Sequence, residues 1–129
     1  MAPLSVTELQ SESEKLKQRL GSMIDENVSL KYRLSEVLKA HFDKKMLLEV
    51  EGYQNYFVRE DELIGLLRND IAVLDKLMKT SIIEGNETSP IDRKLKQLRC
   101  NILSVEFQFK MLKAEFVSYL IRNKLTWKE

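Results

Sequence analysis

The stretch that decides the fold covers residues 9–37 and reads LQSESEKLKQRLGSMIDENVSLKYRLSEV. Apolar residues recur along it every seven positions, and a second, mostly apolar series lies three or four positions away. Spacing of this kind, kept over several heptads, is typical of a coiled-coil helix whose two series face a partner helix. We therefore predict a coiled-coil dimerisation helix over residues 5–40. The expected interface residues are Leu9, Leu16, Leu20, Met23, Asn27, Leu30, Leu34 and Val37.

The polar residue in this seam, Asn27, favours a parallel, in-register homodimer. In that arrangement the amides of both copies meet, whereas other pairings bury each amide against an aliphatic side chain. An unmet buried polar group costs about 1–3 kcal/mol. The flanking charges agree, because Glu12 of one copy would face Lys17 of the other, and Glu26 would face Lys31 in the same way. The alternative is that this helix packs on its own chain and Asn27 is partly hydrated.

The first helix is expected to begin at a capping box and to continue past its heptads. Ser5 can accept a hydrogen bond from the amide of Glu8, whose carboxylate can reach back. Residues 39–45 contain neither glycine nor proline, although His41 and Lys44 end the heptad pattern. We favour a nearly continuous helix through this junction, with a bend allowed near His41.

The second half of the chain predicts a helical hairpin. Its expected parts are a helix over residues 45–80, a loop over residues 81–89 and a helix over residues 90–125. Gly85 suits a left-handed turn residue, and Pro90 suits the first turn of the following helix. A loop this short folds the two helices back antiparallel. Residues 1–4 and 126–129 are then terminal tails.

The apolar faces of this hairpin are too broad for two helices to cover. The stripe of its first helix is widened by Leu63, Leu66, Val73 and Leu77. Two hairpins from two chains would bury these faces as an intermolecular four-helix bundle, which agrees with the upstream dimer. The expected fold class is therefore all-α, a parallel dimeric coiled coil followed by an antiparallel hairpin.

The register of the hairpin can be estimated by folding it about residue 85. This pairs Tyr53 with Phe116 and brings Glu60 near Lys110. Glu60 fills the one polar slot in the apolar series of its helix. Two interpretations of Glu60 remain: it forms an ion pair with Lys110, or it is solvated.

Composition limits the compartment and the class of partner. The chain has 129 residues, of which 32% are charged, and a formal net charge of +1. This near-neutral balance gives no general attraction to nucleic acid or to an anionic membrane. The single cysteine, Cys100, fits a reducing compartment, and the sequence has neither a signal-peptide pattern nor an apolar run that could span a bilayer. We expect a cytoplasmic protein without membrane contact.

The sequence contains no motif for catalysis, for a cofactor or for a metal ion. His41 and Cys100 are each the only residue of their kind, too few for a usual zinc site. Glu60, Asp61 and Glu62 are consecutive, so on a helix they point in different directions. We interpret His41 as structural or solvated, with a pH switch as the alternative, and Cys100 as a small, partly buried residue.

Two features could contact a partner. One is a basic stretch at the start of the last helix, made of Arg93, Lys94, Lys96 and Arg99. The other is the only tryptophan, Trp127, which would either cap the bundle or anchor a partner.

The leading hypothesis is a non-enzymatic homodimeric adaptor that binds itself and another protein. The alternative is a dimeric regulatory module that binds nucleic acid through the basic stretch, for which the overall charge gives no support.

Overall fold

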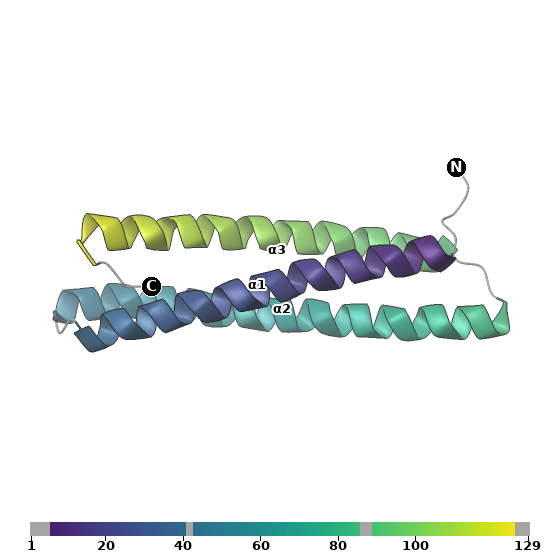
Figure 1. The fold of residues 1–129 in the computed structure, drawn as a ribbon, viewed down its shortest axis with the longest axis horizontal. Helices are drawn as coiled ribbons and strands as arrows, with labels where there is room; N and C mark the ends of the chain where they lie inside the picture. The colour runs from purple at the N-terminus through teal and green to yellow at the C-terminus, as the bar shows by residue number, and fades with distance from the viewer. Residues whose placement is uncertain (1–5, 41–42, 86–88, 126–129) are drawn as a thin grey trace.

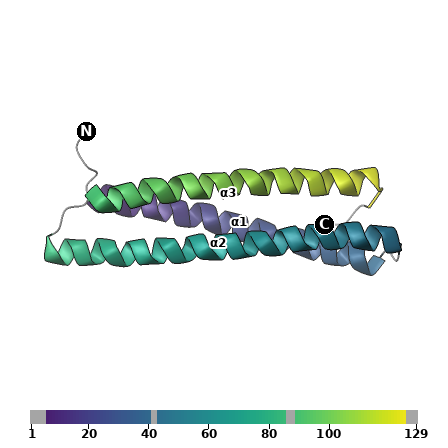
Figure 2. The ribbon, with the colours of Figure 1, turned by 180° about the vertical axis from the view of Figure 1, so that it is seen from behind.

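The fold is all-α, with three long helices packed as a bundle within one chain. A computed structural model of the protein describes residues 6–40, 43–85 and 89–125. The helices are α1 (Val6–Ala40), α2 (Lys44–Glu84) and α3 (Ser89–Arg122). They lie side by side along an elongated molecule, with the start of α1 beside the start of α3 and the end of α1 beside the start of α2 (Figures 1 and 2). Therefore α1 and α3 run in the same direction, and α2 runs opposite to both.

The chain reverses direction between α1 and α2, so the expected continuous helix through residues 39–45 is wrong. The backbone of Asp43 is extended, with φ −67° and ψ 123°. Its carboxylate accepts a hydrogen bond of 2.9 Å from the backbone N–H of Lys45. This is the capping arrangement that starts a new helix without glycine or proline. His41 lies outside the described residues.

The predicted turn at Gly85 is confirmed. Its φ of 69° and ψ of 26° lie in the left-handed region, which favours glycine because a Cβ is disfavoured there. The Gly85 N–H donates to the carbonyl of Ser81, which closes the last turn of α2. The following helix begins at Ser89 and has Pro90 in its first turn, so α2 and α3 form the expected antiparallel hairpin.

The seam of α1 is buried inside its own chain. Each of the eight residues that we assigned to a dimer interface is at most 5% exposed: Leu9, Leu16, Leu20, Met23, Asn27, Leu30, Leu34 and Val37. The seven apolar residues among them join one core with the apolar residues of α2 and α3. The seam that we expected between two chains therefore lies within one chain. The observed bundle has three helices from one chain, whereas we expected a bundle of four helices from two chains. A parallel dimer through the same residues would first require α1 to leave the bundle.

Aromatic rings fix the register between α2 and α3. The rings of Tyr53 and Phe116 lie 5.2 Å apart between centroids, which confirms the pair expected from folding about residue 85. Phe116 also meets Phe57 edge to face at 5.3 Å, and Tyr53 contacts Tyr119 at 5.2 Å. These distances are in the favourable range for aromatic pairs.

Candidate interaction surfaces

Ion pairs at seven-residue steps set the register between α1 and α3. Glu12 pairs with Arg99 at 2.7 Å and Arg19 pairs with Glu106 at 3.2 Å. Glu26 pairs with Lys113 in the same way. In each pair the two residues are 87 positions apart, as a parallel pair of heptad helices requires. Since the signs alternate along α1, a slip by one heptad would set Glu12 against Glu106 and would bring like charges together.

A second series of polar contacts ties α1 to α2. Lys17 pairs with Asp75, whose carboxylate also accepts a 2.8 Å hydrogen bond from the Ser13 hydroxyl. Lys31 pairs with Asp61. The hydrogen bond to Asp75 raises the pKa of the Lys17 ammonium, although its partial burial acts in the opposite direction. The charges that we expected to meet a second copy therefore have partners within their own chain.

The alternating charges give the first prediction, a test of register. We expect Arg19→Glu to lower the free energy of unfolding by about 1 kcal/mol, because it sets a like charge against Glu106. Adding Glu106→Arg should restore most of the loss, since the reversed pair is again attractive. Urea unfolding followed by circular dichroism measures both changes. A double variant that is no more stable than Arg19→Glu alone would contradict the pairing.

A polar layer crosses the middle of the bundle. The Asn27 side-chain amide donates to the backbone carbonyl of Phe57, at 3.1 Å, and to the carboxylate of Asp61. The amide oxygen of Asn27 has no hydrogen-bond partner among the described residues. Asn27 is fully buried, so the partly hydrated side chain that we considered is not observed. Its role here is to join α1 to α2.

Glu60 lies buried in α2 and is 7% exposed. Its Oε2 has no hydrogen-bond partner within the described ranges. Burial raises the pKa of the Glu60 carboxyl. Lys110 contacts Glu106 at 3.7 Å instead, so neither the expected Glu60–Lys110 pair nor a solvated Glu60 is observed.

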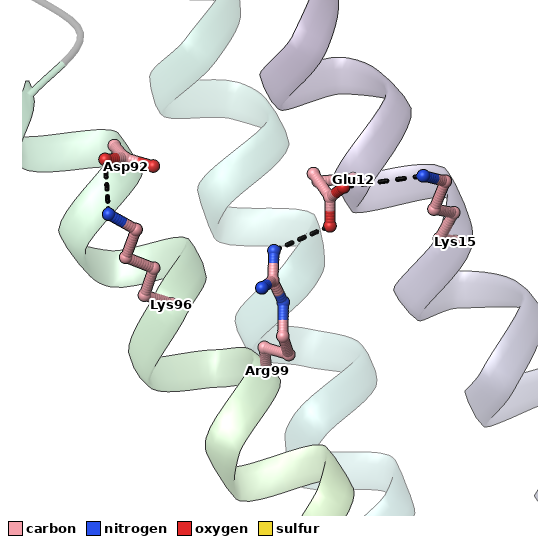
Figure 3. A network of polar contacts seen from close by, with 5 residues as sticks. All are labelled: Glu12, Lys15, Asp92, Lys96 and Arg99. Carbon is pink, nitrogen blue, oxygen red and sulfur yellow. Dashed lines mark hydrogen bonds and ion pairs between the residues drawn. The ribbon is translucent and has the colours of Figure 1, made fainter. Parts of the chain in front are cut away.

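The basic stretch of α3 is partly neutralised by acidic neighbours, as Figure 3 shows. Lys96 pairs with Asp92 on the preceding turn at 3.1 Å. Arg99 reaches across to Glu12 of α1, which also contacts Lys15 at 3.5 Å. Arg93 and Lys94 are exposed. The four cations therefore do not act together as one free patch, and Trp127 lies outside the described residues.

A groove of about 270 Å³ lies between α2 and α3 and is lined by residues of these two helices. Its apolar part is formed by Val73, Leu74, Leu77 and Leu98. Asp70 and Lys94 stand on opposite walls, one from each helix. The basic stretch thus contributes one residue, Lys94, to this groove, whose α2 wall includes Val73 and Leu77 of the widened apolar stripe.

Large apolar side chains are also exposed on the outside of both helices. Leu66 is 63% exposed and Val73 52% on α2, and Phe107 is 65% exposed and Met111 53% on α3. We call these four residues the α2/α3 outer face. The sequence indicated its α2 part as a widened stripe, but Phe107 and Met111 lie outside the core heptad positions and were missed. Groups of large exposed apolar residues often mark a protein interface.

Other candidate groups do not come together into a site. Cys100 is exposed, so the expectation that it is partly buried is wrong. Across the described ranges, no three histidine, cysteine or acidic residues are grouped to hold a metal ion. None of the three helices, over those same ranges, has an apolar stretch that could cross a membrane.

No family model, curated protein or solved structure matches this chain.

Proposed function

We propose that this protein is a non-enzymatic helical adaptor that acts as a homodimer in protein–protein assembly. The observation that carries the proposal is the α2/α3 outer face, because its residues are apolar and exposed although the core of the bundle is already covered. The polar residues beside Asn27 support the non-enzymatic part, since Asn27 and Lys31 of α1 both contact Asp61 of α2 and so join two helices. The single cysteine supports a cytoplasmic location.

Two routes to a homodimer differ in what α1 does. A parallel coiled coil of two α1 helices would need α1 to give up its buried seam and its ion pairs with α2 and α3. Although the α1 seam would be buried again between two α1 helices, the core residues of α2 and α3 that α1 covers would be exposed, at a cost of roughly 25 cal/mol per Å² of apolar area. A dimer of closed bundles through the α2 part of the α2/α3 outer face needs no opening, and we favour it.

The nucleic-acid alternative has less support. Lys96 and Arg99 are paired with acidic side chains, which leaves Arg93 and Lys94 to contact phosphate. Binding through two cations would show a shallow dependence on salt. Retention on heparin at moderate salt, lost in Arg93→Ser/Lys94→Ser, would favour this alternative over the adaptor.

Two measurements test the proposed adaptor function: the molar mass of the purified protein in solution and the proteins that cross-link to it in cell extracts. Light scattering of the purified full chain should show a concentration-dependent dimer. Proteins that cross-link to the wild type in cell extracts should no longer cross-link to the Phe107→Asp variant. They should still cross-link to the Tyr32→Asp variant. Tyr32 is the matched control because it is 67% exposed, on α1 instead of α3. A strict monomer with identical cross-links for both variants would refute the proposal.

A further inference from the structure

The outer side of α2 carries a second heptad-like stripe that faces away from the core. It consists of Glu62, Leu66, Asn69, Val73 and Lys76, and we call it the α2 outer stripe. The spacing alternates between four and three residues, so the five side chains share one face of the helix. All five are exposed. The stripe thus has the pattern of a helix–helix seam with no helix of its own chain covering it.

The order of residues in the stripe is symmetric about Asn69. An apolar residue stands on each side of it, Leu66 before and Val73 after, and a charge follows at each end. The end charges are opposite, Glu62 on one side and Lys76 on the other. Neither forms an ion pair with another described residue, whereas the charges beside the α1 seam are paired within the chain.

This symmetry matches a second copy of the same stripe running antiparallel. In that arrangement Glu62 meets Lys76 of the second copy, and the same pair forms again by symmetry. Leu66 then meets Val73 of the second copy, and the two Asn69 amides can hydrogen-bond to each other. A parallel arrangement would oppose Glu62 to Glu62 and Lys76 to Lys76, which is unfavourable.

Small residues beside the stripe leave room for a close approach. Gly65 and Ala72 flank it and are exposed. A Cβ added at Gly65 would meet nothing within 4 Å, so that space is open among the residues that the structure describes. Gly21 and Gly52 are equally open. The charge symmetry is therefore what identifies the partner, and Gly65 provides the space for it.

We propose that two copies dock antiparallel through the α2 outer stripe, with the two-fold axis at Asn69. This rests on the homodimer proposed above and specifies its interface. Each bundle stays closed, and α1 takes no part. Two apolar anchors per copy suit a small interface of the weak, transient class.

The first test changes an apolar anchor. Leu66→Asp should raise the dimer dissociation constant by about a hundredfold in sedimentation equilibrium, because the buried charge appears twice in a symmetric interface. Leu48→Asp is the matched control, since Leu48 is on the same helix and is 66% exposed against 63% for Leu66. In the antiparallel register Leu48 lies beyond the end of the partner helix, so its dimer should persist. Equal effects of the two changes would overturn the interface.

The second test exchanges the end charges. Lys76→Glu alone should weaken the dimer about tenfold, because both symmetric pairs become repulsive. Adding Glu62→Lys should restore the wild-type dissociation constant, since each pair is again attractive. The thermal unfolding of the monomer should not change, because neither charge has an ion-pair partner within the described part of the chain. A double variant as weak as the single one would contradict the pairing.

The third test distinguishes antiparallel from parallel docking. In a Cys100→Ser background, Asn69→Cys should form a disulfide-linked dimer under mild oxidation, because the two residues meet at the axis. Asn55→Cys should not, because antiparallel docking separates the two copies of residue 55 by about 42 Å along the helix. Cross-linking at both positions would indicate a parallel pair and would overturn the proposal.

The outcomes also separate this interface from the function that it serves. A chain that stays monomeric at all concentrations overturns both the homodimer and its interface. A dimer that is insensitive to Leu66→Asp overturns the interface alone and leaves the adaptor function standing.

Discussion

Replacing Phe116 by alanine is expected to lower the free energy of unfolding by about 3–5 kcal/mol. The Phe116 ring is fully buried, and it contacts the rings of Tyr53 and Phe57 at 5.2 and 5.3 Å. The substitution removes the buried area and both aromatic contacts, and these contacts contribute about 0.5–1.5 kcal/mol each beyond burial. It also leaves a cavity between long helices whose ends are fixed by turns, so the space cannot close easily.

Urea unfolding followed by far-UV circular dichroism, at a concentration where the chain is monomeric, measures this loss. The control is Phe107→Ala, because Phe107 is 65% exposed on the same helix. That change should shift the free energy by no more than about 0.5 kcal/mol. A loss below about 1 kcal/mol for Phe116→Ala would mean that the aromatic cluster does not hold α3 on α2.

Replacing Glu60 by leucine is expected to stabilise the protein at neutral pH by about 1–3 kcal/mol. Glu60 is buried, and its Oε2 lacks a hydrogen-bond partner within the described residues. At neutral pH this oxygen of the carboxylate is therefore held away from water without a hydrogen-bond partner within the described residues. A leucine of similar volume continues the apolar series of α2 without that penalty.

The benefit of Glu60→Leu should depend on pH in a defined direction. Burial raises the pKa of the Glu60 carboxyl in the folded state above its value in the unfolded chain. The folded protein therefore binds this proton more tightly, so stability from Glu60 is present below the unfolded pKa and is lost as pH rises through the folded pKa.

The difference in unfolding free energy between variant and wild type should consequently shrink as the pH falls from neutral through the folded-state pKa of Glu60, and should be constant below the unfolded carboxyl pKa of about 4. Denaturant titrations at several pH values measure it, with Glu51→Leu as the control at an exposed site of the same helix. A difference that stays constant with pH would show that Glu60 is not buried in its charged form.

The helices and the hairpin could be predicted because their signals are local. Gly85 supplies the left-handed turn conformation that glycine adopts without strain. The alternating four- and three-residue spacing of apolar residues predicts which face of each helix is buried. Tyr53 and Phe116 followed from the turn position alone. These elements depend on residues close in the sequence and on one short loop, so they can be predicted from the sequence alone.

The partner of α1 could not be predicted from its heptads. An apolar seam with charges beside it looks the same whether a second copy or the same chain covers it. The deciding feature is the reversal before Lys44, which depends on the Asp43 cap and has no glycine or proline to mark it. Glu12 and Glu26 each pair with a basic residue of α3 because Arg99 and Lys113 have the same fourteen-residue spacing, which is two heptads.

The candidate surface was only half visible in the sequence. Leu66 and Val73 were recognised as apolar beyond the needs of a narrow seam, but they were assigned to a bundle between hairpins. Phe107 and Met111 gave no signal, since single exposed apolar residues are common on protein surfaces. Their meaning depends on α2 and α3 lying side by side, which only the fold shows.

Packing of α1 on its own chain is tested most directly by an engineered cross-link between α1 and α3. Glu12→Cys and Arg99→Cys, in a Cys100→Ser background, place two thiols where side chains contact at 2.7 Å. Treatment with a short bismaleimide should join α1 to α3 within one chain, giving a monomer mass that persists on dilution. If links form only between chains, and form less when the protein is diluted before treatment, α1 leaves the bundle and pairs with a second copy.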